Sequence, residues 1–439
     1  MEKFYHINNK GIPSECKAKS PEKCRFHGKH FDDYNKALEY ADSINEQIKK
    51  VDICETVLKM PKLNNLLNKL SEKGAKTYFV GGIVRDEFLN KESKDLDIEI
   101  HNISVEDFKK TLKENNIEAD LVGESFGVFK ARLDGEDIDL SFPRTEKQLG
   151  NKHTDFEITI DPFVGLKKAS ERRDFTIGAI MKDTRTGEII DFHNGIQDLK
   201  DGIIRHTSDK FTEDGLRIYR AAQFASRFNF KIADETKGLF SPNLIKDLSN
   251  ERVKEELKKA IEKSTKPSIF FNSLEDDLLK VHFPSVVENR DKLGYLDEFS
   301  KTNHQDKDFS SISQAILYKF TKASDKEIKL ITNEKEVLRF INKIPPLEEF
   351  KKVNSKNVLK FIHKDKDLIP RLLPLFKNEK FIQESVNKYN RIEFITSTDL
   401  INKGIKPGKE FGMLLKELQN KQLQGKSKEE ILKNIQSLN

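Results

Sequence analysis

The strand pattern of this chain stops near residue 210, and this change constrains its fold more than any other feature. Between residues 75 and 200, short apolar runs and alternating segments are interleaved with helical spacing, which predicts a mixed α/β domain. From about residue 210 to the C-terminus, apolar residues recur at helical spacing alone. The chain is therefore expected to be α+β, with a small mixed α/β head followed by an all-helical body and tail.

Composition excludes several classes of protein. The chain has 439 residues, of which 36% are hydrophobic, and this is enough for several cores and argues against a disordered chain. No apolar run approaches the ~18 residues of a membrane span, so no membrane association is expected. Three cysteines are too few for a disulfide framework, which indicates a reducing compartment and a cytoplasmic location. The sequence does not indicate the oligomeric state.

Charge is divided unevenly along the chain. Asp and Glu slightly outnumber Lys and Arg over residues 1–300, whereas Lys and Arg are in clear excess over residues 301–439. A basic C-terminal part can lie against a polyanion such as a nucleic acid. Lysine-rich helices are about as often plain solvated surfaces, and the charge pattern alone does not separate the two interpretations.

A pair of glycines opens the strongest functional signal. Gly81 and Gly82 lie between an expected strand at 77–80 and an expected helix at 83–89. At such a turn the main-chain amides can approach a phosphate closely, and the N-terminus of the helix adds partial positive charge. Arg85, about one turn into the helix, can reach the same phosphate.

Two aspartates follow on the next expected strand, 95–100. Asp95 and Asp97 are two residues apart, so both carboxylates project from one face. Adjacent carboxylates beside a phosphate site are typical Mg²⁺ ligands, and two ions would activate a hydroxyl and steady a leaving pyrophosphate. A third acid is expected from Asp137 or Asp139, and the spacing does not choose between them. Taken alone, two aspartates on a strand more often mark a solvated edge than a metal site. The preceding Gly81, Gly82 and Arg85 make the metal site the favoured interpretation.

Five ordered motifs resemble those of class II tRNA nucleotidyltransferases and bacterial poly(A) polymerases, which belong to the DNA polymerase β-like nucleotidyltransferase superfamily. The resemblance is continuous over roughly residues 75–285 and returns near 395–435. It implies a nucleotidyltransferase head, Mg²⁺ in a two-ion arrangement, tRNA as partner, and CTP and ATP as substrates. The motifs occupy 78–86 with Asp95-Leu96-Asp97, 172–177, 191–199 with Arg205, 213–220, and 250–253 with 399–408.

The resemblance also implies roles for individual residues. Asp95, Asp97 and Asp139 would be the catalytic acids, with Asp95 and Asp97 as the magnesium ligands. Gly178 stands where the family usually has Asn, and Gln223 stands where it usually has Arg, which removes one cation from the expected triphosphate pocket. The nucleotide pocket would be lined by Gly81, Gly82, Arg85, Arg173, Asp174, Asp214, Arg217 and Arg220.

Asp214 and Arg217 have a physical rationale for selecting the base. They are three residues apart in an expected helix and would share one face. Cytosine and adenine present an amine donor beside a ring-nitrogen acceptor, which Asp and Arg can satisfy together, whereas uracil and guanine present the reverse. A wrong base would leave buried charges unpaired at about 1–3 kcal/mol per group. Taken alone, the pair is an ordinary helix salt bridge.

The first 50 residues lie outside the resemblance. Cys16, Cys24, His27 and His30 are four potential zinc ligands, but their spacing is unusual for a zinc finger, and a loop-rich cap or partner-docking segment is the alternative. Four domains are expected: 1–50, a small polar Cys/His segment; 51–205, the nucleotidyltransferase head; 206–290, a helical nucleotide-selecting neck; and 291–439, a basic, helical tRNA-binding body and tail.

These features predict an enzyme that adds CCA to the 3′ end of tRNA, without a nucleic-acid template, from CTP and ATP. The RNA 3′-hydroxyl would attack the α-phosphate and release pyrophosphate. The alternatives are a poly(A) polymerase, a partial enzyme that adds only CC or only A, and a catalytically silent RNA-binding protein of the same fold. The presence of Asp95, Asp97, Asp214 and Arg217 favours an enzyme over the silent protein.

Overall fold

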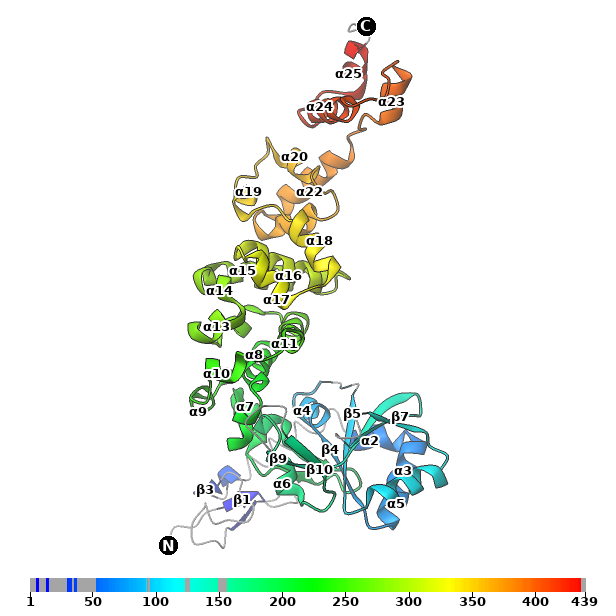
Figure 1. Ribbon diagram of the computed structural model, residues 1–439, viewed down its shortest axis with the longest axis vertical. Coiled ribbons are helices and arrows are strands. Elements are labelled where there is room, and N and C mark those ends of the chain that lie inside the picture. The colour runs from blue at the N-terminus through cyan, green and yellow to red at the C-terminus, as the bar shows by residue number, and fades with distance from the viewer. Residues whose placement is uncertain are drawn as a thin grey trace. The chain divides into compact units, whose positions relative to one another are not determined.

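The structure is a computed structural model that describes residues 5–7, 13–15, 30–33, 35–37, 53–91, 93, 95–122, 127–148 and 156–435. The chain forms two compact units, Met1–Leu248 and Ser249–Asn439. This boundary falls within the expected neck at 206–290, and the four-part division stays a prediction. The first unit mixes strands and helices, and the elements described in the second unit are all helical (Figure 1). The predicted α+β class is confirmed.

A seven-stranded sheet forms the centre of the first unit, in the order β12-β11-β4-β5-β8-β7-β6. β5 and β8 pair in parallel, and the other neighbours pair antiparallel. The strands are β4 (Lys76–Val80), β5 (Leu96–His101), β6 (Ala119–Val122), β7 (Val128–Leu133), β8 (Glu136–Ser141), β11 (Met181–Asp183) and β12 (Ile189–Ile190).

One face of the sheet is covered by α3 (Pro61–Glu72) and α5 (Val105–Glu114). Leucines at 63, 66, 67 and 70 form the buried stripe of α3, as helical periodicity requires. Phe108 of α5 meets the rings of Phe129 and Phe142 edge-on, with centroids 5.1 and 5.2 Å apart. These contacts fix α5 on the sheet because buried aromatic pairs combine large apolar area with a preferred geometry.

The opposite face of the sheet carries the polar residues of β5. Leu96, Ile98 and Ile100 are buried, and the residues between them point to the other side. Tyr78 pairs in register with Glu99, and the apolar cluster of Tyr78, Val80 and Met181 packs on the same side. This face is therefore partly covered, which makes its charged side chains unusually well shielded from water.

Short strands complete the first unit, and one of them was not expected. β14 (Lys231–Ile232) pairs in parallel with β13 (Ile203–Ile204), so the expectation that no strand follows residue 210 is wrong at this point. A two-residue strand is too short to produce a detectable alternation. The remaining strands are β1 (Tyr5–Ile7), β2 (Pro13–Glu15), β3 (His30–Phe31), β9 (Arg144–Gln148) and β10 (Phe156–Ile160).

The other helices of the first unit connect these strands or follow them. They are α2 (Ile53–Leu58), α4 (Gly82–Phe88), α6 (Leu166–Ser170), α7 (Gly195–Asp201), α8 (Leu216–Phe228), α9 (Asp234–Lys237) and α10 (Pro242–Ile245), with 3₁₀ turns η2 (Thr176–Gly178) and η3 (Asp209–Glu213).

The second unit is a succession of short helices joined by tight turns. Aromatic residues fill much of its interior; the rings of Phe350 and Phe376 stack with centroids 4.8 Å apart. Its elements are α11 (Asn250–Glu262), α12 (Ser268–Asn272), α13 (Asp276–His282), α14 (Pro284–Glu288), η4 (Arg290–Lys292), α15 (Leu293–Asn303), α16 (Phe309–Phe320), α17 (Asp325–Ile331), α18 (Lys335–Lys343), α19 (Leu347–Lys351), α20 (Val358–Ile362), α21 (Ile369–Leu372), η5 (Leu373–Leu375), α22 (Glu379–Asn390), α23 (Ser397–Asn402), α24 (Phe411–Leu423) and α25 (Lys428–Ile435).

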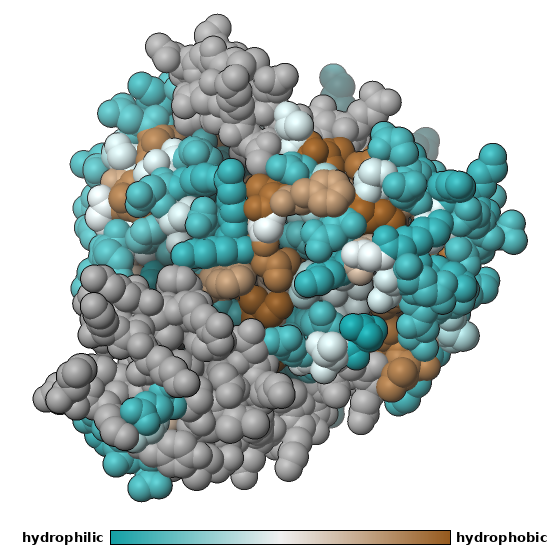
Figure 2. Space-filling model, turned by 90° about the horizontal axis from the view of Figure 1, so that it is seen from below, coloured by the Kyte–Doolittle hydropathy of each residue, from teal (hydrophilic) through white to brown (hydrophobic). Residues whose placement is uncertain are grey.

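On the face shown in Figure 2 the described residues are mostly hydrophilic, and apolar side chains gather near the centre of the view. Apolar atoms make up more than half of the accessible surface of an ordinary folded protein, so small apolar patches need no ligand to explain them. Among the described helices, none combines the length and the apolar character that crossing a membrane requires.

The turn before α8 has no room for a side chain. A Cβ added at Gly215 would overlap the main-chain carbonyl oxygen of Leu244, and a main-chain atom cannot move aside as the end of a flexible side chain can. We expect Gly215→Ala to lower the free energy of unfolding by about 1–3 kcal/mol, because the backbone of α8 or α10 must shift. Urea denaturation measures this loss.

The matched control for Gly215→Ala is Gly294→Ala. An added Cβ at Gly294 meets no atom within 4 Å. Because Gly294 lies inside α15, alanine there should leave stability unchanged or raise it by up to ~1 kcal/mol. Equal effects of the two substitutions would show that the steric explanation for Gly215 is wrong.

Candidate active site

The Gly81–Gly82 turn joins β4 to α4 and lies at the centre of the candidate site. Gly81 has φ of 71° and ψ of −128°, a conformation that glycine adopts readily and other residues rarely do. A Cβ added there would lie 3.5 Å from Asp97 Oδ2 and 3.6 Å from Arg173 Nη1. Two of the five motifs, 78–86 with Asp95-Leu96-Asp97 and 172–177, therefore meet at this turn.

Strands β5 and β8 bring two of the predicted acids together. Their parallel register pairs Asp97 with Asp139, so the two carboxylates project side by side from one face. Asp95 directly precedes β5 and is exposed. Asp137 is the other candidate for the third acid, but its side chain is 87% exposed. Of these two candidates, Asp139 is therefore the one opposite Asp97.

The electrostatics of these acids fit a hard cation. Burial is the main reason that the pKa of Asp97 rises to about 6; Arg173 lowers this pKa, while Asp139 and Asp95 raise it. Mutually repelling carboxylate oxygens of this kind are the donors that Mg²⁺ prefers. Asp139, the third predicted acid, forms an ion pair with Lys130, whose Nζ lies 3.2 Å from Asp139 Oδ1. Among the described residues, no three His, Cys, Asp or Glu side chains are grouped closely enough to share one metal ion.

A buried carboxylate holds Arg173. Glu99 Oε2 accepts a hydrogen bond from Arg173 Nη2 at 3.0 Å, and Glu99 Oε1 lies 3.0 Å from His101 Nε2. Burial raises the pKa of Glu99, but the hydrogen bond with His101 and the charge of Arg173 outweigh it, so this pKa falls to about 2. Glu99 and His101 are not among the predicted site residues, although both continue the polar alternation of Asp95 and Asp97 along β5.

Asp174 and Arg220, both predicted to line the nucleotide pocket, are in direct contact. Asp174 Oδ2 accepts a hydrogen bond from Arg220 Nε at 2.6 Å, while Oδ1 accepts one from the main-chain amide of Phe175 at 2.9 Å. The Arg220 guanidinium also lies 5.4 Å from the ring centroid of Phe224. Asp174 thus connects the 172–177 motif to α8.

Arg85 lies inside the unit. It is 5% exposed, and its Nη2 donates to Asp86 Oδ1 at 2.7 Å. The guanidinium lies over the rings of Phe224 and Phe228, 5.4 and 4.8 Å from their centroids. A Cβ added at Gly82 would lie 3.5 Å from Arg85 Nη2. These contacts fasten α4 to α8, and a direct role of Arg85 at a phosphate stays a prediction.

Asp214 lies outside helix α8, so the expectation that both residues of the base-selecting pair belong to one helix is wrong, while their role in base selection stays a prediction. α8 begins at Leu216, and Asp214 precedes it in an extended conformation. Asp214 Oδ1 accepts a hydrogen bond from the Leu216 amide at 3.0 Å. Leu216 is the first residue of α8, so its amide has no acceptor within the helix, and the Asp214 carboxylate supplies one. Arg217 is anchored separately, since its Nη2 donates to the carbonyl oxygen of Arg172 at 3.0 Å.

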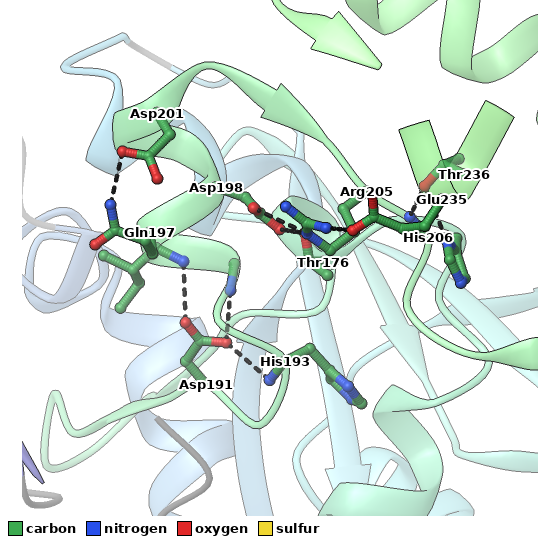
Figure 3. A network of polar contacts seen from close by, with 12 residues as sticks. Thr176, Asp191, His193, Gln197, Asp198, Asp201, Arg205, His206, Glu235 and Thr236 are labelled. Atoms are coloured by element: carbon green, nitrogen blue, oxygen red, sulfur yellow. Dashed lines mark hydrogen bonds and ion pairs between the residues drawn. The ribbon is translucent and has the colours of Figure 1, made fainter. Parts of the chain in front are cut away.

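A polar network lies behind the 172–177 motif (Figure 3). Asp198 Oδ2 accepts from Thr176 Oγ1 at 2.6 Å, and Arg205 Nε lies 3.1 Å from both Asp198 oxygens. Asp191 accepts from the main-chain amides of His193, Gly195 and Ile196 at the start of α7. Burial raises the pKa of Asp191 despite these hydrogen bonds. The network fixes the motif against α7.

The two departures from the family pattern lie close to these groups. A Cβ added at Gly178 would lie 3.8 Å from Asp174 Oδ1, so an Asn at this position would begin beside that carboxylate. Gln223 is 2% exposed on α8, where an arginine would have placed a buried charge.

The possible zinc ligands fall mostly beyond what the structure describes. Cys16, Cys24 and His27 lie outside the described residues, and His30 is described only as part of β3. The zinc site stays a prediction.

Known proteins are similar to this chain, and the family match lies in its head. Residues 77–205 match the family described as the Poly A polymerase head domain, which confirms the predicted resemblance. The "Multifunctional CCA protein" of Xanthomonas axonopodis pv. citri is 35% identical over 224 residues, which are 48% of this chain and 51% of that protein. The protein of the same name from Nitrosospira multiformis is 38% identical over 205 residues, 46% of this chain and 47% of that one. The chain spans about half the length of the curated relatives it matches.

Solved structures share the fold over most of the chain. The Thermotoga maritima CCA-adding enzyme complexed with tRNA aligns with a TM-score of 0.65 and 24% identity, covering 90% of this chain and 98% of that one. A CCA-adding enzyme complexed with ATP aligns with a TM-score of 0.64 and 24% identity, covering 88% and 94%. At this level of identity the likeness shows the fold, which agrees with the predicted head, body and tail.

Proposed function

We propose that this chain is a tRNA nucleotidyltransferase that adds CCA to the RNA 3′ end from CTP and ATP without a nucleic-acid template. The observation that carries the proposal is that Asp97 and Arg173 meet at Gly81. A Cβ added at Gly81 would lie 3.5 Å from Asp97 Oδ2 and 3.6 Å from Arg173 Nη1. Nucleotidyl transfer needs a phosphate cradle, paired carboxylates and a cation beside them. The names of the relatives and of the proteins with the same fold support this proposal.

The side chains of the site would bind and orient the two reactants. The amides of the Gly81–Gly82 turn and the Arg173 guanidinium would contact the triphosphate. Asp95 and Asp97 would hold Mg²⁺, with Asp139 as the third acid, and the bound ion would supply Lewis acidity at the reacting phosphate. The RNA 3′-hydroxyl would attack the α-phosphorus and lose its proton, and the bond to the bridging oxygen of pyrophosphate would break.

The partner RNA would contact the basic part of the chain. Lys and Arg exceed Asp and Glu over residues 301–439, so binding would rest on phosphate contacts and weaken as salt is raised. A cytoplasmic location, expected from the few cysteines, stays a prediction.

Nucleotide incorporation tests the proposed function. Labelled CTP, ATP, UTP and GTP would be offered singly and together, with Mg²⁺, to tRNA transcripts that end before CCA, after C and after CC. Addition of two C and one A, followed by a stop, supports the proposal. Long A tails would favour the poly(A) polymerase alternative, to which the family name of the head domain also refers. Bound tRNA without incorporation would favour the silent RNA-binding protein.

Base selection gives a second test, on Arg217. We expect Arg217→Ala to lower the ratio of kcat/KM for CTP to that for UTP by about 10- to 100-fold, because one hydrogen bond to the correct base is lost. Asp214→Ala should act in the same direction. Steady-state incorporation of each nucleotide measures the ratio. Lys237→Ala, which removes an exposed cation on α9 of the same unit, is the control and should leave the ratio unchanged. An unchanged ratio in the Asp214 and Arg217 variants would contradict base selection by this pair.

A further inference from the structure

Three side chains form a continuous polar chain that ends at Arg173. Glu99 uses one carboxylate oxygen for Arg173 Nη2 and the other for His101 Nε2, each at 3.0 Å. The side chains of His101 and Glu99 are 3% and 6% exposed, whereas that of Arg173 is 29% exposed. Exposure thus increases from His101 toward the candidate site.

His101 is itself held in place. Its ring meets that of Tyr78 edge-on, with centroids 5.5 Å apart, and Tyr78 belongs to the apolar cluster on this face of the sheet. Because Glu99 has a partner at each oxygen, rotation of its carboxylate would break two hydrogen bonds in a place with little water.

The two ends of the Arg173 guanidinium face different surroundings. Nη2 donates to Glu99, while Nη1 lies 3.6 Å from the position of a Cβ on Gly81, beside Asp97. A guanidinium is planar and its nitrogens form a rigid fork, so fixing one nitrogen fixes the direction of the other. Glu99 therefore determines where the second nitrogen of Arg173 points.

We propose that Glu99 is a positioning residue for nucleotide binding. It holds Arg173 so that Nη1 faces the phosphates of a nucleoside triphosphate at the Gly81 turn, and His101 holds Glu99. This inference rests on the proposed function, because it takes the Gly81 turn as the place where the triphosphate binds. Because Arg173 is already oriented, it loses less conformational entropy when the nucleotide binds. We therefore expect Glu99 to affect nucleotide affinity.

The central test is Glu99→Gln. Glutamine keeps the shape of the side chain but removes the charge that orients Arg173. We expect the Kd for ATP and CTP to rise about tenfold by equilibrium dialysis, with KM rising in parallel and kcat changing less than about threefold. A purely structural role would lower thermal stability and leave Kd unchanged, and this result would overturn the proposal.

Glu256→Gln is the matched control. The Glu256 side chain is 2% exposed and accepts a hydrogen bond from Lys259 Nζ at 3.0 Å within α11 of the second unit, which contains none of the predicted site residues. Both substitutions replace a buried carboxylate by the amide of the same size. The control should lose stability to a similar degree and bind nucleotide like the wild-type protein.

A double-mutant cycle tests whether Glu99 acts through Arg173. In an Arg173→Ala background, Glu99→Gln should add less than about twofold to Kd, because the residue that it orients is gone. A full tenfold effect in that background would overturn the proposal. If Glu99→Gln does not fold, His101→Gln gives the second route, with an expected rise in Kd of about threefold that also vanishes in the Arg173→Ala background.

The outcomes separate this inference from the proposed function. If wild-type protein binds nucleotide and Glu99→Gln weakens binding, but no acceptor RNA is extended, the proposed function fails and the inference stands. If extension occurs and Glu99→Gln binds nucleotide normally, the inference fails alone. A wild-type protein that binds neither ATP nor CTP would overturn both.

Discussion

Asp97→Asn is expected to lower kcat/KM for nucleotide incorporation by about a thousandfold or more, because it removes a negative oxygen from the place where Mg²⁺ and the α-phosphate would meet. Asp97 lies opposite Asp139 in the sheet and beside Gly81 and Arg173. Of the three predicted catalytic acids, it is the one with contacts to the other parts of the site. Single-turnover addition of CTP to tRNA that lacks CCA measures the loss. Affinity for tRNA, measured by filter binding, should not change.

The same substitution should make the metal-free protein more stable at neutral pH. The folded pKa of Asp97, about 6, lies above its ordinary value of 3.8, so the folded protein holds this proton more tightly than the unfolded chain does. The resulting stability is fully present below pH 3.8 and is lost as the pH rises through 6. Asn carries no such charge. We therefore expect Asp97→Asn to raise the free energy of unfolding by about 1–2 kcal/mol at pH 8, after a discount for partial exposure, and by almost nothing near pH 4.

Thermal melts with and without Mg²⁺ complete this test. Ligand that binds only the folded state stabilises it, so Mg²⁺ should raise the melting temperature of the wild-type protein and not that of Asp97→Asn. Asp120→Asn, an exposed aspartate on β6 of the same sheet, is the control and should resemble the wild type in every measurement. Full incorporation activity in Asp97→Asn would remove Asp97 from the catalytic site.

Lys182→Met is expected to destabilise the first unit by about 3–5 kcal/mol, because it leaves a buried carboxylate without its cation. Lys182 Nζ lies 2.6 Å from Glu87 Oε1, and the two side chains are 3% and 0% exposed. This pair joins β11 to α4, the helix that follows the Gly81–Gly82 turn. Guanidinium denaturation, followed by a probe in the first unit, measures the change.

The double variant Lys182→Met/Glu87→Met separates charge from packing. With both charges gone, apolar side chains of similar length fill the space, and most of the lost stability should return. If the double variant is as unstable as Lys182→Met alone, the loss comes from packing and the stranded charge is not its cause.

The sequence predicts the parts of the site whose signals are local. Gly81 with Gly82 marks a strand-to-helix turn, and alternation places Asp95 and Asp97 on one side of β5. Helical spacing and the loss of strand pattern likewise predict the helical second unit. Each signal lies within a window of about one element, which is the range over which periodicity is informative.

The features that the sequence does not reveal depend on contacts between distant segments. The choice of Asp139 over Asp137 follows from the register between β5 and β8, and the role of Glu99 follows from an arginine 74 residues away. That Asp214 lies before α8 in an extended conformation, with its side chain bound to the Leu216 amide, is likewise not visible from helix propensity alone.

The parallel pairing of β5 with β8 has a consequence for how this chain matures. These neighbours are separated in the chain by α5, β6 and β7, so a hairpin cannot bring them together and a long loop must close first. Arg173, which completes the site, follows β8 in the sequence and can join the site only after these strands have been synthesised. Pairings of such long range are slow to form, so nucleotide binding should appear among the last events of refolding. During synthesis, a nascent chain that has not yet exposed Arg173 would already contain the aspartates but would have no complete site with which to extend an RNA end.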